Sequence, residues 1–178
     1  STTPPGPHKD QAAAQSCSKL WVIYYPLSAW AWLCSSAFHG RDTRCTERLD
    51  YYAAGALIAF TTYLTLVRTL LIASSRLRAA VALPVATYYM WHIYHMHFIL
   101  FDYGRHVRVC IAAGLVQAAL WLWWVFLRAP QWHQGRRWLL SFVVLLHVSM
   151  LFEVLDFPPV GHGLDAHACW HLCTAPLA

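Results

Sequence analysis

Two histidines near the end of the chain, His167 and His171, are the residues best placed to do chemistry together. They are four residues apart, so on a helix their rings lie on one face and can bind one metal ion. The chain contains 11 histidines among 178 residues, so this spacing also arises by chance and the pair needs partners. Candidate partners lie far earlier in the sequence, where Ser35 and His39 repeat the spacing and Asp50 follows.

These residue types together suit a catalytic zinc site. Three imidazoles, from His39, His167 and His171, would leave one position of a tetrahedral Zn²⁺ ion open, which is the ligand count of a catalytic site. Zinc lowers the pKa of a bound water to about 7 and so supplies hydroxide at neutral pH. Asp50 is the candidate general base, and Ser35 is the candidate hydrogen-bond donor to an oxyanion. Such a site at a membrane suits hydrolysis of an acyl ester or amide in a lipid.

Each candidate also has a purely structural interpretation. The histidines would then only form hydrogen bonds inside a helical bundle. Asp50 directly precedes an apolar stretch, and a carboxylate at a helix N-terminus is stabilised by the helix dipole by about 0.3 to 1 kcal/mol. A second histidine run, His92, His95 and His97, has spacings of three and two residues. These spacings do not hold three rings on one helical face, so we do not predict a metal site there, although His92 merits attention.

The composition indicates a membrane protein. The chain is 58% hydrophobic and 12% charged, with ten tryptophans, and its mean hydropathy is +0.40. A membrane-spanning helix takes about 20 residues, and five stretches meet that length: 20–39, 51–73, 80–101, 109–127 and 138–155. A sixth begins near Leu164 and reaches Ala178. We therefore predict an all-α, polytopic transmembrane bundle with six helices, preceded by a disordered linker over 1–18 and occupying 19–178.

Counting the crossings brings the candidate residues together. If the first span exits on one side of the membrane, the second and the sixth spans both enter from that side. Ser35, His39, Asp50, His167 and His171 are therefore expected near one membrane face. The opposite side carries more Lys and Arg, which indicates that it is cytosolic and that the candidate site faces the lumen or the exterior.

The motif Ser35-x-x-x-His39, Asp50 and His167-x-x-x-His171 resembles the zinc hydrolase superfamily of alkaline ceramidases and progestin/adiponectin receptors. Longer strings resemble one branch, the post-GPI-attachment-to-proteins factor 3 family: Phe38-His39-Gly40-Arg41-Asp42, Leu155-Asp156-Phe157-Pro158-Pro159 and Leu164-Asp165-Ala166-His167. The match begins near Trp21 and reaches the C-terminus. The chain departs from the family at Arg105 and His106, because the family usually continues Asp-Tyr-Gly with Tyr-Asn.

The resemblance implies a seven-helix protein of the Golgi or endoplasmic reticulum membrane, of which this chain is expected to be truncated at both ends. It implies a GPI-specific phospholipase A2 that removes the sn-2 acyl chain of GPI anchors at a site facing the lumen. The implied zinc ligands are His39, His167 and His171, with Ser35 and Asp50 as catalytic residues. The implied partners are membrane lipid and GPI-anchored proteins as substrates, with no nucleic acid.

Three alternatives remain from the sequence. An alkaline-ceramidase-like amidase shares the metal chemistry and differs in substrate, so the ester is favoured by the resemblance alone. A receptor-like membrane protein would use the same fold without catalysis. A bis-histidine haem protein is the third alternative, although the chain has no CxxCH attachment motif.

Overall fold

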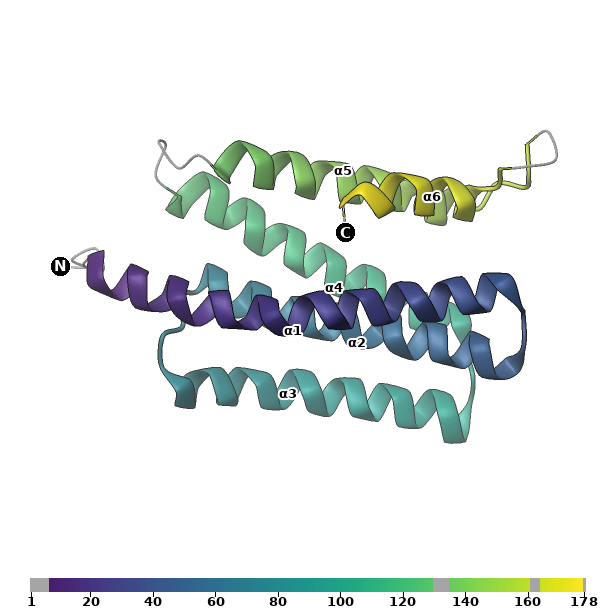
Figure 1. The fold of residues 1–178 in the computed structure, drawn as a ribbon, viewed down its shortest axis with the longest axis horizontal. Helices are drawn as coiled ribbons and strands as arrows, with labels where there is room; N and C mark the ends of the chain where they lie inside the picture. The colour runs from purple at the N-terminus through teal and green to yellow at the C-terminus, as the bar shows by residue number, and fades with distance from the viewer. Residues whose placement is uncertain (1–6, 130–134, 161–163, 178) are drawn as a thin grey trace. The chain divides into compact units, whose positions relative to one another are not determined.

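The computed structural model describes residues 7–129, 135–160 and 164–177. Within these ranges the protein has six α-helices and no strand, as the sequence predicts (Figure 1). The helices are α1 Pro7–Gly40, α2 Arg44–Thr69, α3 Ser75–Tyr94, α4 Tyr103–Trp123, α5 Gly135–Leu155 and α6 Ala166–Thr174. Short π-helices continue α3 and α4, namely η1 His95–Ile99 and η2 Trp124–Arg128, and a 3-10 turn, η3 Ala175–Leu177, follows α6.

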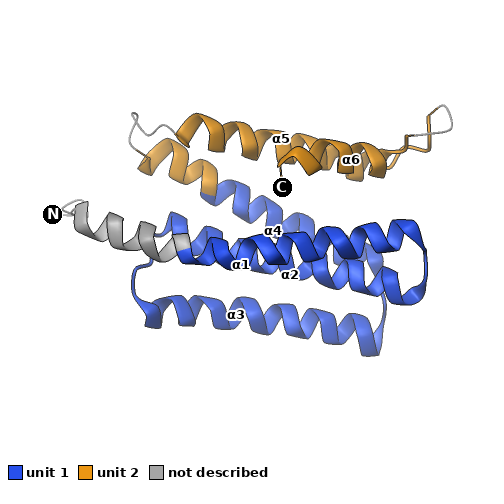
Figure 2. Ribbon diagram, viewed as in Figure 1, with its two compact units in different colours: residues 1–120 blue, residues 121–178 orange. Residues whose placement is uncertain are grey.

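The chain divides into two compact units (Figure 2). Unit 1 takes in residues 1–120, and unit 2 takes in residues 121–178. Unit 1 therefore contains α1, α2, α3 and most of α4, whereas unit 2 contains η2, α5 and α6. Ser35, His39 and Asp50 belong to unit 1, and the His167/His171 pair belongs to unit 2.

Among the described residues, two helices have both the length and the apolar composition to cross a membrane. One is α4 continued by η2, Tyr103–Arg128, and the other is α5, Gly135–Leu155. Helices α1 to α3 are 34, 26 and 20 residues long, which suffices for a crossing. Their tyrosines, tryptophans, threonines and serines make them less apolar than α4 and α5.

The first helix begins earlier than the sequence analysis expects. We expected a disordered linker over 1–18, whereas α1 begins at Pro7. Proline is favoured in the first turn of a helix because its missing N–H would lack an intrahelical partner there. The alanines that follow at 12–14 are strong helix formers. Pro26 also lies inside this helix.

A short loop over 41–43 makes α1 and α2 an antiparallel hairpin (Figure 1). Thr43 is the N-cap of α2, and its hydroxyl accepts a hydrogen bond from the backbone N–H of Thr46 at 3.2 Å. The Thr46 hydroxyl in turn accepts one from the Thr43 N–H at 3.0 Å. This reciprocal capping box fixes where α2 begins. The helices are then held together by buried Cys34 and Ala53 and by the Phe38 and Tyr51 rings, whose centroids are 6.1 Å apart.

Helix α2 also packs against α3 and α4 within unit 1. Gly55 is buried in α2, and a Cβ atom at this position would lie 3.4 Å from ring atoms of both His106 and Tyr89. These are ordinary van der Waals distances, so both rings lie directly against the α2 backbone at Gly55. Tyr89 donates a hydrogen bond to the Tyr52 carbonyl at 3.0 Å, and Gln117 on α4 donates to the Thr62 hydroxyl at 2.9 Å.

Unit 2 is built around the packing of α5 on α6. Asp165 is the N-cap of α6, and its carboxylate accepts a hydrogen bond from the Ala168 N–H at 2.7 Å. A side-chain acceptor here satisfies one of the free N–H groups at the helix start. The cap, two residues before His167, therefore fixes where α6 begins.

Candidate active site

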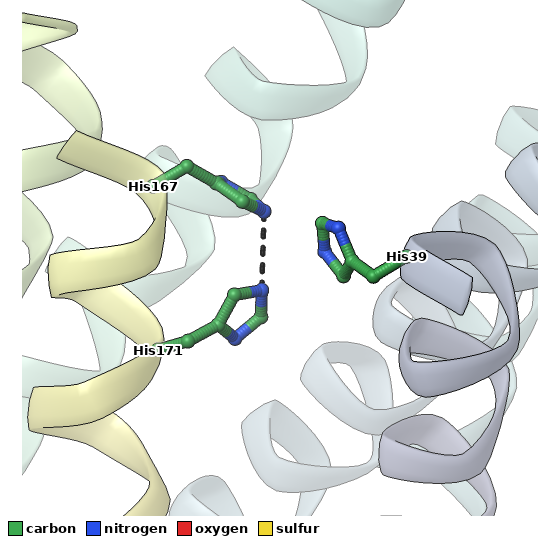
Figure 3. Close-up of side chains that lie close together, drawn as sticks. All are labelled: His39, His167 and His171. Atoms are coloured by element: carbon green, nitrogen blue, oxygen red, sulfur yellow. Dashed lines mark hydrogen bonds between the residues drawn. The ribbon is translucent and has the colours of Figure 1, made fainter. Parts of the chain in front are cut away.

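His167 and His171 lie on consecutive turns of α6, as their spacing predicts. Figure 3 shows their two rings turned toward each other, with Nε2 of His171 3.1 Å from Nε2 of His167. The ring centroids are 4.6 Å apart and the ring planes are nearly perpendicular, at 87°. Both side chains are half-buried. The structure therefore brings the Nε2 atoms of two imidazoles close enough together to bind one metal ion.

Glu153, in the last turn of α5, forms a hydrogen bond with the other nitrogen of the His167 ring. Its Oε2 lies 2.8 Å from Nδ1 of His167. A carboxylate only accepts hydrogen bonds, so Nδ1 of His167 is the donor. If the His167 ring is neutral, its Nε2 is then an acceptor, and the proton between the two histidines comes from His171. A metal ion bound to both rings would replace that proton.

The other three candidate residues lie at one end of the α1–α2 hairpin in unit 1. Ser35 and His39 are in the last two turns of α1, and Asp50 is in the second turn of α2. Because only 41–43 separate the two helices, these residues share the end of the hairpin that carries the loop. Ser35 and Asp50 are half-buried, whereas His39 is exposed.

The structure changes the interpretation of Asp50. The structural interpretation placed Asp50 at the start of a helix, where the helix dipole alone would explain the carboxylate. Helix α2 instead begins at Arg44, well over one turn before Asp50, because of the Thr43–Thr46 capping box. The influence of a helix dipole falls off within the first turn, so Asp50 gains little from it. The first-turn acidic residue is Glu47.

The three histidines that the sequence predicts as ligands, His39, His167 and His171, each offer one ring nitrogen for a metal ion. Figure 3 draws their side chains. His39 comes from unit 1 and the other two from unit 2. We treat the binding of one ion by all three as a proposal.

The rings of the second histidine run, His92, His95 and His97, do not point toward a common site. His92 is buried, and its Nε2 lies 3.1 Å from Nδ1 of His106 on α4. His95 contacts the Arg105 guanidinium, with 2.9 Å between Nε2 and Nη1. Nδ1 of His97 is 3.1 Å from the Tyr52 hydroxyl. The three rings therefore have three different partners, in agreement with the helical spacing.

Sequence reasoning missed two of these contacts. No role was assigned to Glu153 from the sequence, although a carboxylate in an apolar helix is itself a signal of function. His106 was noted only as a departure from the family pattern, whereas it lies in α4 and pairs with His92. Arg105 and His106, the two positions at which the chain departs from the family pattern, both lie in α4 and contact the second histidine run.

Residues 7–178 match the Per1-like family. Among curated proteins, the chain is 39% identical over 155 residues to "GPI-specific phospholipase A2-like PGAP3" of Danio rerio, which covers 85% of this chain and 47% of that protein. It is 34% identical over 172 residues to "Protein PER1 homolog" of Schizosaccharomyces pombe, covering 94% of this chain and 51% of that one.

A third relative is "Post-GPI attachment to proteins factor 3" of Drosophila melanogaster, which is 36% identical over 162 residues and covers 91% of this chain and 49% of that protein. The chain thus spans about half the length of the curated relatives it matches. No solved structure matches it.

Proposed function

Because the chain belongs to the Per1-like family, we propose that it is a zinc-dependent lipid acyl hydrolase that removes the sn-2 fatty acyl chain from GPI anchors. The observation that carries the proposal is that the Nε2 atoms of His167 and His171 lie 3.1 Å apart, while the Glu153 carboxylate binds Nδ1 of His167. The names of the relatives from Danio rerio and Drosophila melanogaster support the choice of substrate.

The residues fit a zinc ion. Two nitrogen ligands at about 2.0 to 2.1 Å from a tetrahedral Zn²⁺ lie about 3.3 Å apart, and the two α6 rings need to separate only slightly to reach that distance. We assign His39 as the third ligand, supported by the crossing count, which places the end of α1 at the same membrane face as the start of α6. When bound, zinc would supply Lewis acidity and activate water for attack on a carbonyl.

Asp50 and Ser35 would perform the proton transfer and the charge stabilisation. Asp50 would accept the proton of the attacking water while the water oxygen bonds to the acyl carbon. The Ser35 hydroxyl would donate a hydrogen bond to the carbonyl oxygen as negative charge develops there. The ester C–O bond then breaks, and the proton held by Asp50 passes to the leaving alkoxide, so the products are a free fatty acid and a lysolipid.

The position of the site suits a membrane lipid as substrate. The candidate residues lie at helix ends, where a lipid ester would meet them while its acyl chain stays among apolar helices. We propose that the protein acts in the Golgi or endoplasmic reticulum membrane, with the site toward the lumen. The excess of Lys and Arg on the opposite side supports this orientation.

Mass spectrometry of the lipid moiety of GPI-anchored proteins tests the proposal. In cells that lack the natural protein, GPI anchors should keep their unsaturated sn-2 chain, and re-expression should restore its removal. The double variant His167→Ala/His171→Ala should not restore it. If anchors are remodelled equally with and without the protein, while ceramide hydrolysis follows its expression, the protein is an amidase and the proposal is wrong.

A further inference from the structure

We infer that Glu153 is a positioning residue of the metal site: its carboxylate orients the His167 ring and fixes its tautomer so that Nε2 faces the metal ion. This inference rests on the proposed function. It adds a residue that contacts neither the lipid nor the metal and acts through His167.

The geometry of three side chains in unit 2 supports the inference. Glu153 Oε2 lies 2.8 Å from His167 Nδ1, and His167 Nε2 lies 3.1 Å from His171 Nε2. The two nitrogens of His167 therefore face opposite partners, a carboxylate on one side and a second imidazole on the other. A neutral imidazole carries one proton, and the carboxylate holds it on Nδ1. The Nε2 lone pair is then directed toward His171, where the proposed metal would bind.

Glu153 is largely shielded from water and lies in an apolar helix, which makes its contact with His167 important. The Glu153 side chain is only 17% exposed and that of His167 is 40% exposed, so water screens the contact only in part. Glu153 lies in the last turn of α5, a helix apolar enough to cross a membrane. A carboxylate in such a helix is costly and requires a partner. Histidines that bind metals commonly donate their second N–H to a carboxylate, which orients the ring and raises its basicity as a ligand.

Neighbouring acidic residues provide a contrast. Asp165 is engaged at the N-cap of α6. Asp156 is exposed and has a φ of 42°, a left-handed conformation that asparagine tolerates well. Replacing Asp156 by Asn therefore removes one carboxylate, three residues from Glu153, without straining the backbone. Asp156→Asn is the matched control.

Zinc affinity of the purified protein tests the inference. Glu153→Ala, which removes both the charge and the acceptor, should weaken Zn²⁺ binding about 10- to 100-fold in competition with a chelator. Glu153→Gln keeps an acceptor in nearly the same shape and should retain part of the affinity. Asp156→Asn should bind Zn²⁺ like the wild type. Co²⁺ in place of Zn²⁺ gives a second readout, because the ligand-field absorption of bound Co²⁺ should change in both Glu153 variants and not in Asp156→Asn.

Thermal unfolding of the metal-free proteins separates positioning from a structural role. If Glu153 positions His167, metal-free Glu153→Gln should unfold at nearly the wild-type temperature while its Zn²⁺ affinity falls. Unchanged affinity in both Glu153 variants would overturn the inference and leave the proposed function standing. If metal-free Glu153→Gln has a lower Tm and an unchanged Zn²⁺ affinity, the Glu153–His167 contact only stabilises the packing of α5 on α6, and the inference is wrong. A wild-type protein that binds no Zn²⁺ would overturn both.

Discussion

Replacing Asp50 by Asn should abolish catalysis while leaving the metal and the fold in place. Asn keeps the size and shape of the side chain and removes its ability to accept a proton from water. In the proposed mechanism Asp50 is a general base and no zinc ligand, so the variant protein should keep the zinc content of the wild type.

The structure sets the expected magnitudes. Asp50 lies in the second turn of α2, so loss of its charge should change the helix-dipole term by less than about 0.3 kcal/mol. Loss of a general base typically costs about 10² to 10⁴ in rate, which corresponds to about 2.7 to 5.4 kcal/mol in the barrier. The effect on the rate barrier should therefore exceed this helix-dipole term by about an order of magnitude.

Three measurements on the Asp50→Asn protein check this reasoning: sn-2 deacylation of GPI anchors by mass spectrometry, zinc content by elemental analysis, and thermal unfolding. Asp42→Asn, in the exposed loop before α2, is the control and should behave like the wild type in all three. Normal remodelling by Asp50→Asn would refute the assignment of the base. Loss of zinc together with activity would make Asp50 a ligand or a residue that orients one, and another base would be needed.

Three further predictions concern single contacts. Ser35→Ala should retain zinc and fold and lower the deacylation rate about 10²- to 10³-fold; a rate near the wild-type value would remove Ser35 from the mechanism. Asp165→Ala removes the N-cap of α6 and should destabilise the helix by about 1 kcal/mol, detected as faster amide exchange at Ala168, whereas Asp165→Asn should preserve the cap. In a double-mutant cycle, His92→Ala and His106→Ala should show a coupling energy of about 0.5 to 3 kcal/mol in chemical unfolding, and additive effects would mean that the 3.1 Å contact contributes nothing to stability.

Local periodicity accounts for what could be predicted from the sequence. His167 and His171 share a helical face because four residues make about one turn, and the structure brings their Nε2 atoms together. The apolar composition likewise predicts an all-α membrane fold. Ser35 and His39 follow the same rule on α1, and the short loop after them places Asp50 at the same end of the hairpin.

Contacts between separate helices explain what could not be predicted. Glu153 meets His167 across the segment that joins α5 to α6, and no spacing rule relates two helices connected in this way. The pairing of His92 with His106 likewise depends on how α3 and α4 rotate against each other. The capping box of α2 does not show its usual sequence signature, because Thr46 takes the place that Glu or Gln usually fills.

The most direct test of the central claim is to measure zinc and sn-2 hydrolysis on the same purified protein. The wild-type protein should hold about one Zn²⁺ per chain and release the sn-2 fatty acid from a GPI lipid in detergent or vesicles. Removal of the zinc with a chelator should stop the release, and Zn²⁺ should restore it. His167→Ala/His171→Ala should have lost both the metal and the activity. Full zinc occupancy in that variant, or undiminished hydrolysis by the metal-free wild type, would contradict the account.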